Sequence, residues 1–487
     1  MTESGRRLLS IGLAAGVVVG LAMGNVQAGV AVAVLGLIWA MLQTPGLPPV
    51  LALALTFQWT QVTVGLYYSW LTGRPMETMV LSDYVTMIWI GLACVVVLTL
   101  GVATGRRIFP AQYDQLPHAE LGASWLLLAA TYGGLTLAEG PLNRLAWDNP
   151  GLTQGILALS LIRLGALYLM MRRCARPEIR WVPLMSLLGL EVVLGLTGYF
   201  AGFREPLYLA AAVLLESIDR RRVKHWFALG AIVIMATTTS VLWIGIRDVY
   251  RSEFQAGEIY DVSREVRLSR LGELASGWYS QKDPTFYYDL DALVDRVWAI
   301  YYPALAVQRV PGAVPHTDGA LLSAALQHVL LPRVLFPDKP VIPSDSEKVR
   351  TYSGVWVAGR DEGTSIAFGY AAESYVDFGV PLMFAPIFVF GVLMGIAFNA
   401  LVRWFHFEEI AVPVLVVVFW LALYPFERSW HNMLGYGGTL LLYLGGLGLL
   451  VDRVLWNRRA LERQERDVYV MPPMAPTPQG PPTAAPR

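Results

Sequence analysis

Charge, cysteine and histidine are all scarce in this chain of 487 residues. Only 15% of the residues are Asp, Glu, Lys or Arg, whereas 55% are hydrophobic and the mean hydropathy is +0.48. This composition excludes an ordinary soluble domain and is typical of a polytopic membrane protein. The two cysteines, Cys94 in an apolar block and Cys174 in an arginine-rich one, provide no pair for an exposed disulfide or a thiolate metal site.

Motifs for soluble cofactors and nucleotides are also missing from the sequence. It has no Walker loop, no GxGxxG after a strand, no zinc-ligand spacing and no DxD motif in a cytosolic domain. We therefore expect no cofactor, no metal and no nucleic-acid partner. A reaction in this protein would use a substrate that is delivered by the membrane or lies outside the cytoplasm.

Long apolar blocks predict an all-α membrane protein, because each helix needs roughly 20 residues to cross a hydrocarbon core of ~30 Å. Strand-like alternation is absent. About twelve blocks meet this description, at residues 8–23, 27–42, 48–70, 79–103, 121–138, 151–171, 181–200, 206–217, 226–246, 379–401, 409–425 and 434–455. The first block resembles a signal peptide, but the second follows at once, which favours a helical hairpin that turns at Gly24 and Asn25.

The distribution of arginine predicts the orientation, since cytoplasmic loops are enriched in Lys and Arg. With a cytoplasmic N-terminus, one side collects most of the basic segments: Arg6, Arg7, 105–107, 172–180, 219–225, Arg403 and the arginine-rich tail. The short loops of the other side keep isolated arginines only: Arg74, Arg144, Arg204 and Arg428. We expect both termini to be cytoplasmic.

Four units follow from this threading: a membrane bundle at 1–246, a loop domain outside the cytoplasm at 247–378, three membrane helices at 379–456, and a tail at 457–487. The tail is rich in proline and predicts disorder. The loop is rich in aromatic residues, which indicates an ordered domain. Three of its stretches have helical spacing, at 261–278, 291–310 and 316–331.

Three arginines, Arg204, Arg247 and Arg428, stand at the outer ends of predicted helices. Guanidinium groups bind phosphate in a bidentate manner, so these residues are candidates for a phosphate or pyrophosphate site. Arg204 and Arg428 are the stronger candidates, because they lie in short loops outside the cytoplasm, where positive charge is normally depleted. The alternative is local ion pairing with the neighbouring Glu205 and Glu427.

Two further outer residues could transfer protons. His431 lies three residues after Arg428, so both could address one ligand, although a structural role for the histidine is the alternative. Glu373 stands four residues before Asp377, just before a membrane helix, and could act as a base or orient a sugar hydroxyl. The alternative is that these two carboxylates form a solvated helix face.

Several short motifs resemble the bacterial oligosaccharide repeat unit polymerases, the Wzy-type O-antigen and exopolysaccharide polymerases. They are LLPRVLFPDKPVIPSD at 330–345, TSIAFGYAAESYVDFG at 364–379 and FREP at 203–206. The resemblance covers about 202–401 and is strongest at 332–379. It implies a metal-independent transferase that joins glycan repeats carried on undecaprenyl pyrophosphate at the outer face of the bacterial inner membrane. His431 and Asn432 are similar to a histidine motif of the related O-antigen ligases, but the glycine spacing that follows it there is not kept.

The resemblance gives the candidate residues their roles. An acceptor sugar hydroxyl would attack the anomeric carbon of a lipid-linked glycan, with His431 or Glu373 as the base. Arg204 and Arg428, helped by Arg333 or Lys339 on the proline-stiffened segment, would stabilise the pyrophosphate. The remaining predicted substrate contacts are Arg247, His316 and three aromatic residues that would stack on sugar rings, Tyr352, Trp356 and Tyr375. For Arg333 and Lys339 the alternative is an irregular loop with pairing to Asp338 or Asp345.

Other functions remain open on the sequence. A ligase would transfer finished chains to a terminal lipid acceptor, and a chain-length regulator is a partner implied by the resemblance. A transporter or flippase would need charges deep in the bundle, for which Asp83, Arg163 and Glu191 are candidates. A noncatalytic scaffold of a synthesis complex is the last alternative.

Overall fold

The computed structural model describes residues 3–44, 46–111, 121–149, 153–176, 178–198, 202–217, 222–254, 262–280, 285–331, 336, 342–359 and 364–469. These ranges contain helices and no strand, which confirms the predicted all-α class. The backbone hydrogen bonds of the apolar segments are thus satisfied within each segment, as a bilayer requires.

All twelve predicted apolar blocks fall on helices. They correspond to α1 (Glu3–Met23), α2 (Val26–Leu42), α3 (Val50–Thr72), α5 (Tyr84–Ile108), α6 (Trp125–Leu137), α8 (Thr153–Ser160) with α9 (Ile162–Ala175), α10 (Trp181–Leu196), α11 (Arg204–Ser217), α12 (Val223–Glu253), α19 (Phe384–Trp404), α20 (Glu408–Leu423), and α21 (Trp430–Leu440), which continues through the π-helical turn η3 (Leu441–Gly445) into α22 (Gly446–Tyr469).

Seven helical segments in the described ranges are long and apolar enough to cross a membrane. They are Glu3–Met23, Val50–Thr72, Tyr84–Ile108, Thr153–Ala175, His225–Glu253, Phe384–Trp404 and Trp430–Glu462. The chain is therefore a helical membrane protein with several spans.

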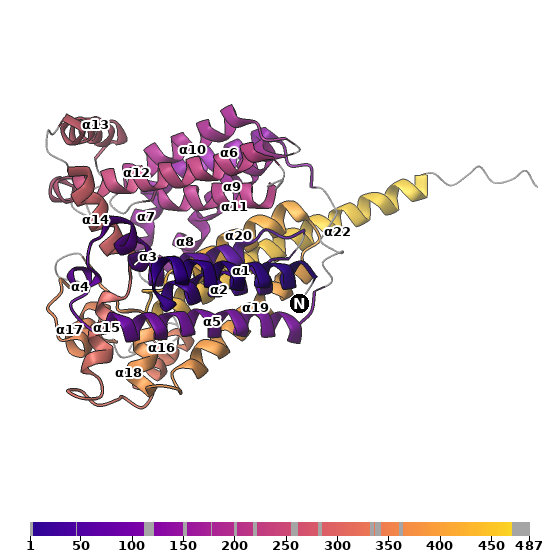
Figure 1. Cartoon of the computed structure of the whole chain (residues 1–487). Helices are drawn as coiled ribbons and strands as arrows, with labels where there is room; N and C mark the ends of the chain where they lie inside the picture. Colours follow the sequence, from indigo (N-terminus) through magenta and orange to yellow (C-terminus); the bar gives the residue numbers. More distant parts are fainter. Residues whose placement is uncertain are drawn as a thin grey trace, which may run out of the picture.

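Shorter helices connect these segments. They are α4 (Met76–Met79), α7 (Glu139–Asp148), α13 (Arg264–Ser280), α14 (Thr285–Val297), α15 (Tyr301–Arg309), α16 (Ala320–Leu330), α17 (Asp345–Ser353) and α18 (Gly369–Phe378). Figure 1 shows α13, α14, α15 and α17 at the left end of the molecule, whereas the N-terminus and the far end of α22 lie toward the right.

The predicted hairpin at the N-terminus is present. α1 ends at Met23, and Gly24 takes a positive φ of 59°, a conformation that glycine adopts without strain. The Asn25 side chain then accepts hydrogen bonds from the backbone N–H groups of Gln27 at 2.8 Å and Ala28 at 3.3 Å, and so caps α2.

The stretch 291–310 was predicted as one helix, but it forms two, α14 and α15, with a break at 298–300. The break occurs because the chain here is anchored to α3. The indole N–H of Trp298 donates to the Val62 carbonyl at 2.9 Å, and the backbone N–H of Ala299 donates to the Gln61 carbonyl at 2.9 Å. Trp298 lies directly over Gly65, where a Cβ would come within 2.3 Å of the indole ring.

Glycines bring the backbones of α5 and α19 close together (Figure 1). A Cβ on Gly105 of α5 would lie 2.0 Å from the Val392 carbonyl oxygen, and one on Gly395 of α19 would lie 2.2 Å from that of Val102. Small residues let helix backbones approach in this way in membranes.

The last helix is longer than predicted. The tail was expected to be disordered from residue 457, but α22 continues to Tyr469. Ala, Leu, Glu, Gln and Arg between these positions have high helix propensity, so the helix propagates beyond its apolar part. Residues 470–487 lie outside the described residues.

Candidate functional site

The segment between α20 and α21 is held by buried amides of α3. The Gln58 side chain donates to the Leu423 carbonyl, and Gln61 Oε1 accepts from the Phe426 N–H at 2.8 Å. Tyr370 of α18 donates its hydroxyl to Gln58 Oε1 at 2.7 Å. Because buried polar groups are costly when unpaired, this network fixes the backbone that leads to Arg428 and His431.

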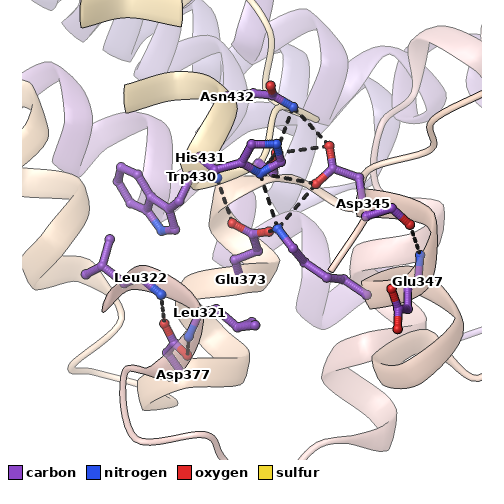
Figure 2. A network of polar contacts seen from close by, with 12 residues as sticks. Leu321, Leu322, Asp345, Glu347, Glu373, Asp377, Trp430, His431 and Asn432 are labelled. Atoms are coloured by element: carbon purple, nitrogen blue, oxygen red, sulfur yellow. Dashed lines mark hydrogen bonds and ion pairs between the residues drawn. The ribbon is translucent and has the colours of Figure 1, made fainter. Parts of the chain in front are cut away.

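A buried polar cluster lies where α17, α18 and the start of α21 meet (Figure 2). We call it the charged cluster; its members are Asp345, Lys348, Glu373, Ser429, His431 and Asn432. Lys348 Nζ is 2.6 Å from Glu373 Oε1 and 3.3 Å from Asp345 Oδ1. The side chains of Lys348 and Glu373 are only 7% and 1% exposed, so this ion pair is shielded from water.

The second oxygen of Glu373 binds the N-terminus of α21. Its Oε2 accepts the backbone N–H of Trp430 at 2.6 Å, and the Trp430 indole N–H donates to Ser374 Oγ at 2.9 Å. A carboxylate is stabilised at a helix N-terminus, where the first N–H groups have no partner within the helix. Glu373 therefore joins α18 to α21 and fixes the position of His431.

The protonation of this pair follows from its contacts. Burial alone would lower the pKa of Lys348, but the nearby Glu373 and Asp345 carboxylates outweigh it and raise that pKa. Burial raises the pKa of the Glu373 carboxyl. We assign Glu373 as ionised because Lys348 and the Trp430 N–H each donate to it at 2.6 Å.

His431 is the part of the charged cluster that reaches toward solvent, with a side chain that is 19% exposed. Its Nδ1 lies 3.1 Å from Ser429 Oγ, 3.4 Å from Lys348 Nζ and 3.6 Å from Asp345 Oδ1. The ring of His328 on α16 stands edge-on to it, with 6.4 Å between the ring centroids.

A second group of cations includes Arg428, from the segment between α20 and α21. We call Arg204, Arg296 and Arg428 the arginine cluster. Arg428 donates to the Leu421 carbonyl at 2.6 Å, and its guanidinium stands over the rings of Tyr436 and Tyr424, at 4.9 and 5.7 Å from their centroids. Tyr424 also interacts electrostatically with Arg204.

Arg296 completes the arginine cluster. Its two terminal nitrogens, Nη1 and Nη2, donate to the two carboxylate oxygens of Glu427 at 2.6 and 3.0 Å. It interacts electrostatically with Arg204, and the Glu427 carboxylate raises the pKa of Arg296. Arg204 is exposed, Arg296 is 58% exposed and Arg428 is half-buried. Glu427 thus pairs with Arg296, and its predicted pairing with Arg428 is not what the structure shows.

The alternative in which Glu373 and Asp377 form a solvated helix face is wrong, because both residues are buried. Asp377 faces the other way and caps α16, where it accepts the backbone N–H groups of Leu321 at 3.0 Å and Leu322 at 2.8 Å (Figure 2). Helix α18 therefore uses one carboxylate for α21 and the other for α16.

The other predicted histidine and two of the predicted aromatic residues serve packing. His316 Nδ1 lies 3.1 Å from the Val376 carbonyl oxygen, and its ring stands edge-on to Tyr375. Tyr375 donates to the Val310 carbonyl at 3.2 Å, and Tyr352 stacks on Phe368 at 6.1 Å between centroids. The rings of Tyr352 and Tyr375 are half-buried and pack against the small core formed by α15, α17 and α18.

The remaining candidates lie apart from both clusters or outside the description. Arg247 pairs with its neighbour Asp248 at 3.2 Å, and among the described contacts none links it to either cluster. Trp356 is 72% exposed, with the Arg350 guanidinium 5.3 Å from its centroid. Arg333 and Lys339 lie outside the described residues.

Several members of the two clusters were not predicted as site residues: Asp345, Lys348, Ser429 and Arg296. Lys348 carried a usable signal, since it is one of only four lysines in the sequence. Asp345 had been considered only as a partner of Arg333 or Lys339. The sequence held no comparable signal for Ser429 or Arg296, because their roles depend on how α14, α17 and α21 pack.

Fold and site together define a helical membrane protein in which the segment 428–431 carries members of both the arginine cluster and the charged cluster. Residues 143–417 match the model of a family described as Domain of unknown function (DUF8712). Since the match covers more than half of the chain, the protein belongs to this family. No curated protein and no solved structure matches the chain.

Proposed function

We propose that this protein is an oligosaccharide repeat unit polymerase, a membrane glycosyltransferase that joins glycan repeats carried on a polyprenyl pyrophosphate. The observation that carries the proposal is the segment 424–432. It places Arg428 of the arginine cluster three residues before a histidine that is backed by buried charges. Guanidinium groups suit the binding of a pyrophosphate, and the histidine suits proton transfer.

In the proposed topology about twelve helices cross the inner membrane of a bacterium, with both termini in the cytoplasm. Residues 247–378 form a domain on the outer face. Two observations support this arrangement: the N-terminus and the end of α22 lie toward one end of the molecule, and α13, α14, α15 and α17 lie at the other (Figure 1). The arginine cluster then faces the compartment in which lipid-linked repeats are polymerised.

The arginine cluster would stabilise the leaving group. As the bond between the anomeric carbon and the phosphate oxygen breaks, its electron pair stays on the pyrophosphate and negative charge grows there. Guanidinium groups can meet that charge with paired N–H donors, each worth on the order of 1.5–3 kcal/mol. In the bound state a phosphate would compete with Glu427 for Arg296.

His431 is the base in this proposal. The acceptor sugar hydroxyl gives its proton to the imidazole while its oxygen forms the new bond to the anomeric carbon. The charged cluster contains two carboxylates, Asp345 and Glu373, and one ammonium, Lys348, so one negative charge remains to stabilise the imidazolium. Glu373 is a positioning residue here, because both its oxygens are occupied and it is only 1% exposed.

The donor and the acceptor are therefore both lipid-linked glycans, and a chain-length regulator is a further proposed partner. A ligase would use the same two clusters, so its product distinguishes it. The transporter alternative has less support. Arg163 pairs with Glu191 at 3.0 Å, Tyr132 donates to the same carboxylate, and Asp83 caps α5, so all three charges are engaged in structural contacts.

The first test is the length of surface polysaccharide in cells whose only copy of the protein carries Arg428→Ala or His431→Gln. We expect chains to shorten to single repeats, with activity reduced roughly 10- to 100-fold for the arginine and about 10²- to 10⁴-fold for the histidine. Arg270→Ala on α13 is the matched control, since Arg270 pairs with Glu253 and Glu273 outside both clusters.

Membrane levels of each variant are measured in parallel. Normal chain length in a well-inserted Arg428→Ala or His431→Gln protein would contradict the proposal. Accumulation of long lipid-linked chains in cells lacking the protein would indicate a ligase, and accumulation of substrate on the inner leaflet would indicate a flippase.

A further inference from the structure

The hydroxyl of Ser429 stands at the centre of the charged cluster. Its Oγ is 3.1 Å from Asp345 Oδ2, 3.1 Å from Asn432 Nδ2 and 3.1 Å from His431 Nδ1. A serine hydroxyl has one proton to donate and two lone pairs that accept. The three neighbours therefore cannot all receive a hydrogen bond from it, and the count decides which atoms hold the protons.

The Asp345 and Asn432 contacts can be assigned first. An ionised carboxylate only accepts, so Ser429 gives its one proton to Asp345. An amide nitrogen only donates, so Ser429 accepts from Asn432. The orientation of that amide is supported independently, since Asn432 Nδ2 also lies 3.0 Å from Asp345 Oδ2. A reversed amide would set its oxygen against the carboxylate.

No proton of Ser429 remains for His431, so a bond between them needs the proton on Nδ1 of the imidazole. The competing donor is Lys348, whose Nζ lies 3.4 Å from the same nitrogen and would require the opposite tautomer. That distance is longer than the 2.7–3.2 Å usual for such bonds. The Lys348 ammonium has three protons; its contacts to Glu373 at 2.6 Å and Asp345 at 3.3 Å are both shorter than its contact to His431. The Ser429 contact, at 3.1 Å, is the better hydrogen bond.

We infer that Asp345, acting through the Ser429 hydroxyl, is a positioning residue that keeps the proton of neutral His431 on Nδ1. Nε2 then carries the lone pair, and no described contact of the protein occupies that nitrogen. The inference rests on the proposed function for its chemical use: Nε2 takes the proton of the acceptor hydroxyl, and Asp345 and Ser429 stabilise the Nδ1–H of the resulting imidazolium. The arrangement has the logic of a carboxylate that orients a catalytic histidine, with a hydroxyl interposed.

Nitrogen NMR of the full-length protein in lipid nanodiscs, with ¹⁵N-labelled histidine, tests the inference without an activity assay. The two ring nitrogens of a neutral imidazole have well-separated shifts, and the His431 signals are identified by their loss in His431→Gln. We expect the Nδ1–H tautomer in the unsubstituted protein. In Ser429→Ala the nearest donor to Nδ1 is Lys348, so we expect the tautomer to reverse to Nε2–H.

Asp345→Asn provides a second, nearly isosteric variant. It frees the Ser429 proton for Nδ1 and should likewise move the imidazole proton toward Nε2. Ser353→Ala is the matched control, because Ser353 is a buried serine of α17 that donates to the Tyr302 carbonyl at 2.9 Å and does not touch His431. It should leave the tautomer unchanged.

The outcomes separate the inference from the proposed function. An Nε2–H tautomer in the unsubstituted protein overturns the inference and assigns the contact to Lys348. An Nδ1–H tautomer that persists in both Ser429→Ala and Asp345→Asn also overturns it, because the proton is then held on Nδ1 without Asp345 or Ser429. Reversal of the tautomer in either variant supports it. If the tautomer reverses while surface chains keep their normal length, the positioning role stands and the proposed role of His431 as base falls.

Discussion

Lys348 is the residue on which the charged cluster depends most. It is the single cation paired with the buried carboxylates of Glu373 and Asp345 in the described part of the cluster. Removing one partner of a buried ion pair leaves an uncompensated charge, which typically costs about 3–5 kcal/mol. We therefore expect Lys348→Met to lower the free energy of unfolding by about that amount, measured by thermal unfolding in detergent.

A double variant separates charge from packing. Lys348→Met combined with Glu373→Gln removes one charge of each sign, so it should recover part of the lost stability. Equal destabilisation in the single and double variants would mean that the ion pair is not the source. Glu273→Gln, an exposed carboxylate of α13 paired with Arg270, should change stability little.

At the scale of single residues the sequence predicted part of the site. Arg428 was identified because positive charge is depleted in short outer loops, His431 because it follows Arg428 by three residues, and Glu373 because it precedes Asp377 by four. The structure brings His431 and Glu373 into one cluster. Their mutual arrangement could not be predicted, since it depends on backbone contacts such as the Trp430 N–H on Glu373. The predicted sugar-stacking role of Tyr352 and Tyr375 was based on residue type alone, and both rings contribute to a small core.

Among the elements, α5 and α19 give the sharpest prediction. A Cβ on Gly395 would lie 2.2 Å from the Val102 carbonyl oxygen, so the two helices must move apart to accept it. Gly395→Ala should lower the free energy of unfolding by about 1–3 kcal/mol, as overpacking does. Gly230→Ala on α12 is the control: nothing lies within 4 Å of that position, and alanine is favoured in helices by about 1 kcal/mol. Thermal unfolding measures the stability of both variants. A Gly395→Ala protein as stable as the unsubstituted one would contradict the close packing of α5 and α19.

Element positions were predicted well, because apolar blocks and caps are local signals. All twelve blocks are helical, and the turn at Gly24 and Asn25 is where the sequence placed it. The errors lie where tertiary contacts override local pattern. The break after α14 is set by Trp298 on Gly65, and the start of α16 is capped from outside the helix, by Asp377 of α18.

For the whole molecule the proposed topology can be tested by labelling. Tyr279 on α13 is 86% exposed, and its substitution by cysteine, Tyr279→Cys, should react with a membrane-impermeant maleimide in intact cells. Arg458→Cys, at an exposed position of α22 beyond the predicted membrane block 434–455, should react only after the cells are opened. The unsubstituted protein is the control, since Cys94 and Cys174 are both buried. Labelling of Arg458→Cys alone in intact cells would invert the proposed orientation.

The anchoring of Trp298 on Gly65 has a mechanical consequence. The Trp298 ring packs against the α3 backbone at Gly65 and donates one hydrogen bond to it, and the Ala299 N–H donates a second. The junction of α14 and α15 therefore moves together with α3. This junction therefore does not act as a hinge. We expect the proposed lipid-linked substrate to reach the arginine cluster laterally, from the bilayer between helices. The junction of α14 and α15 would stay in place during this entry.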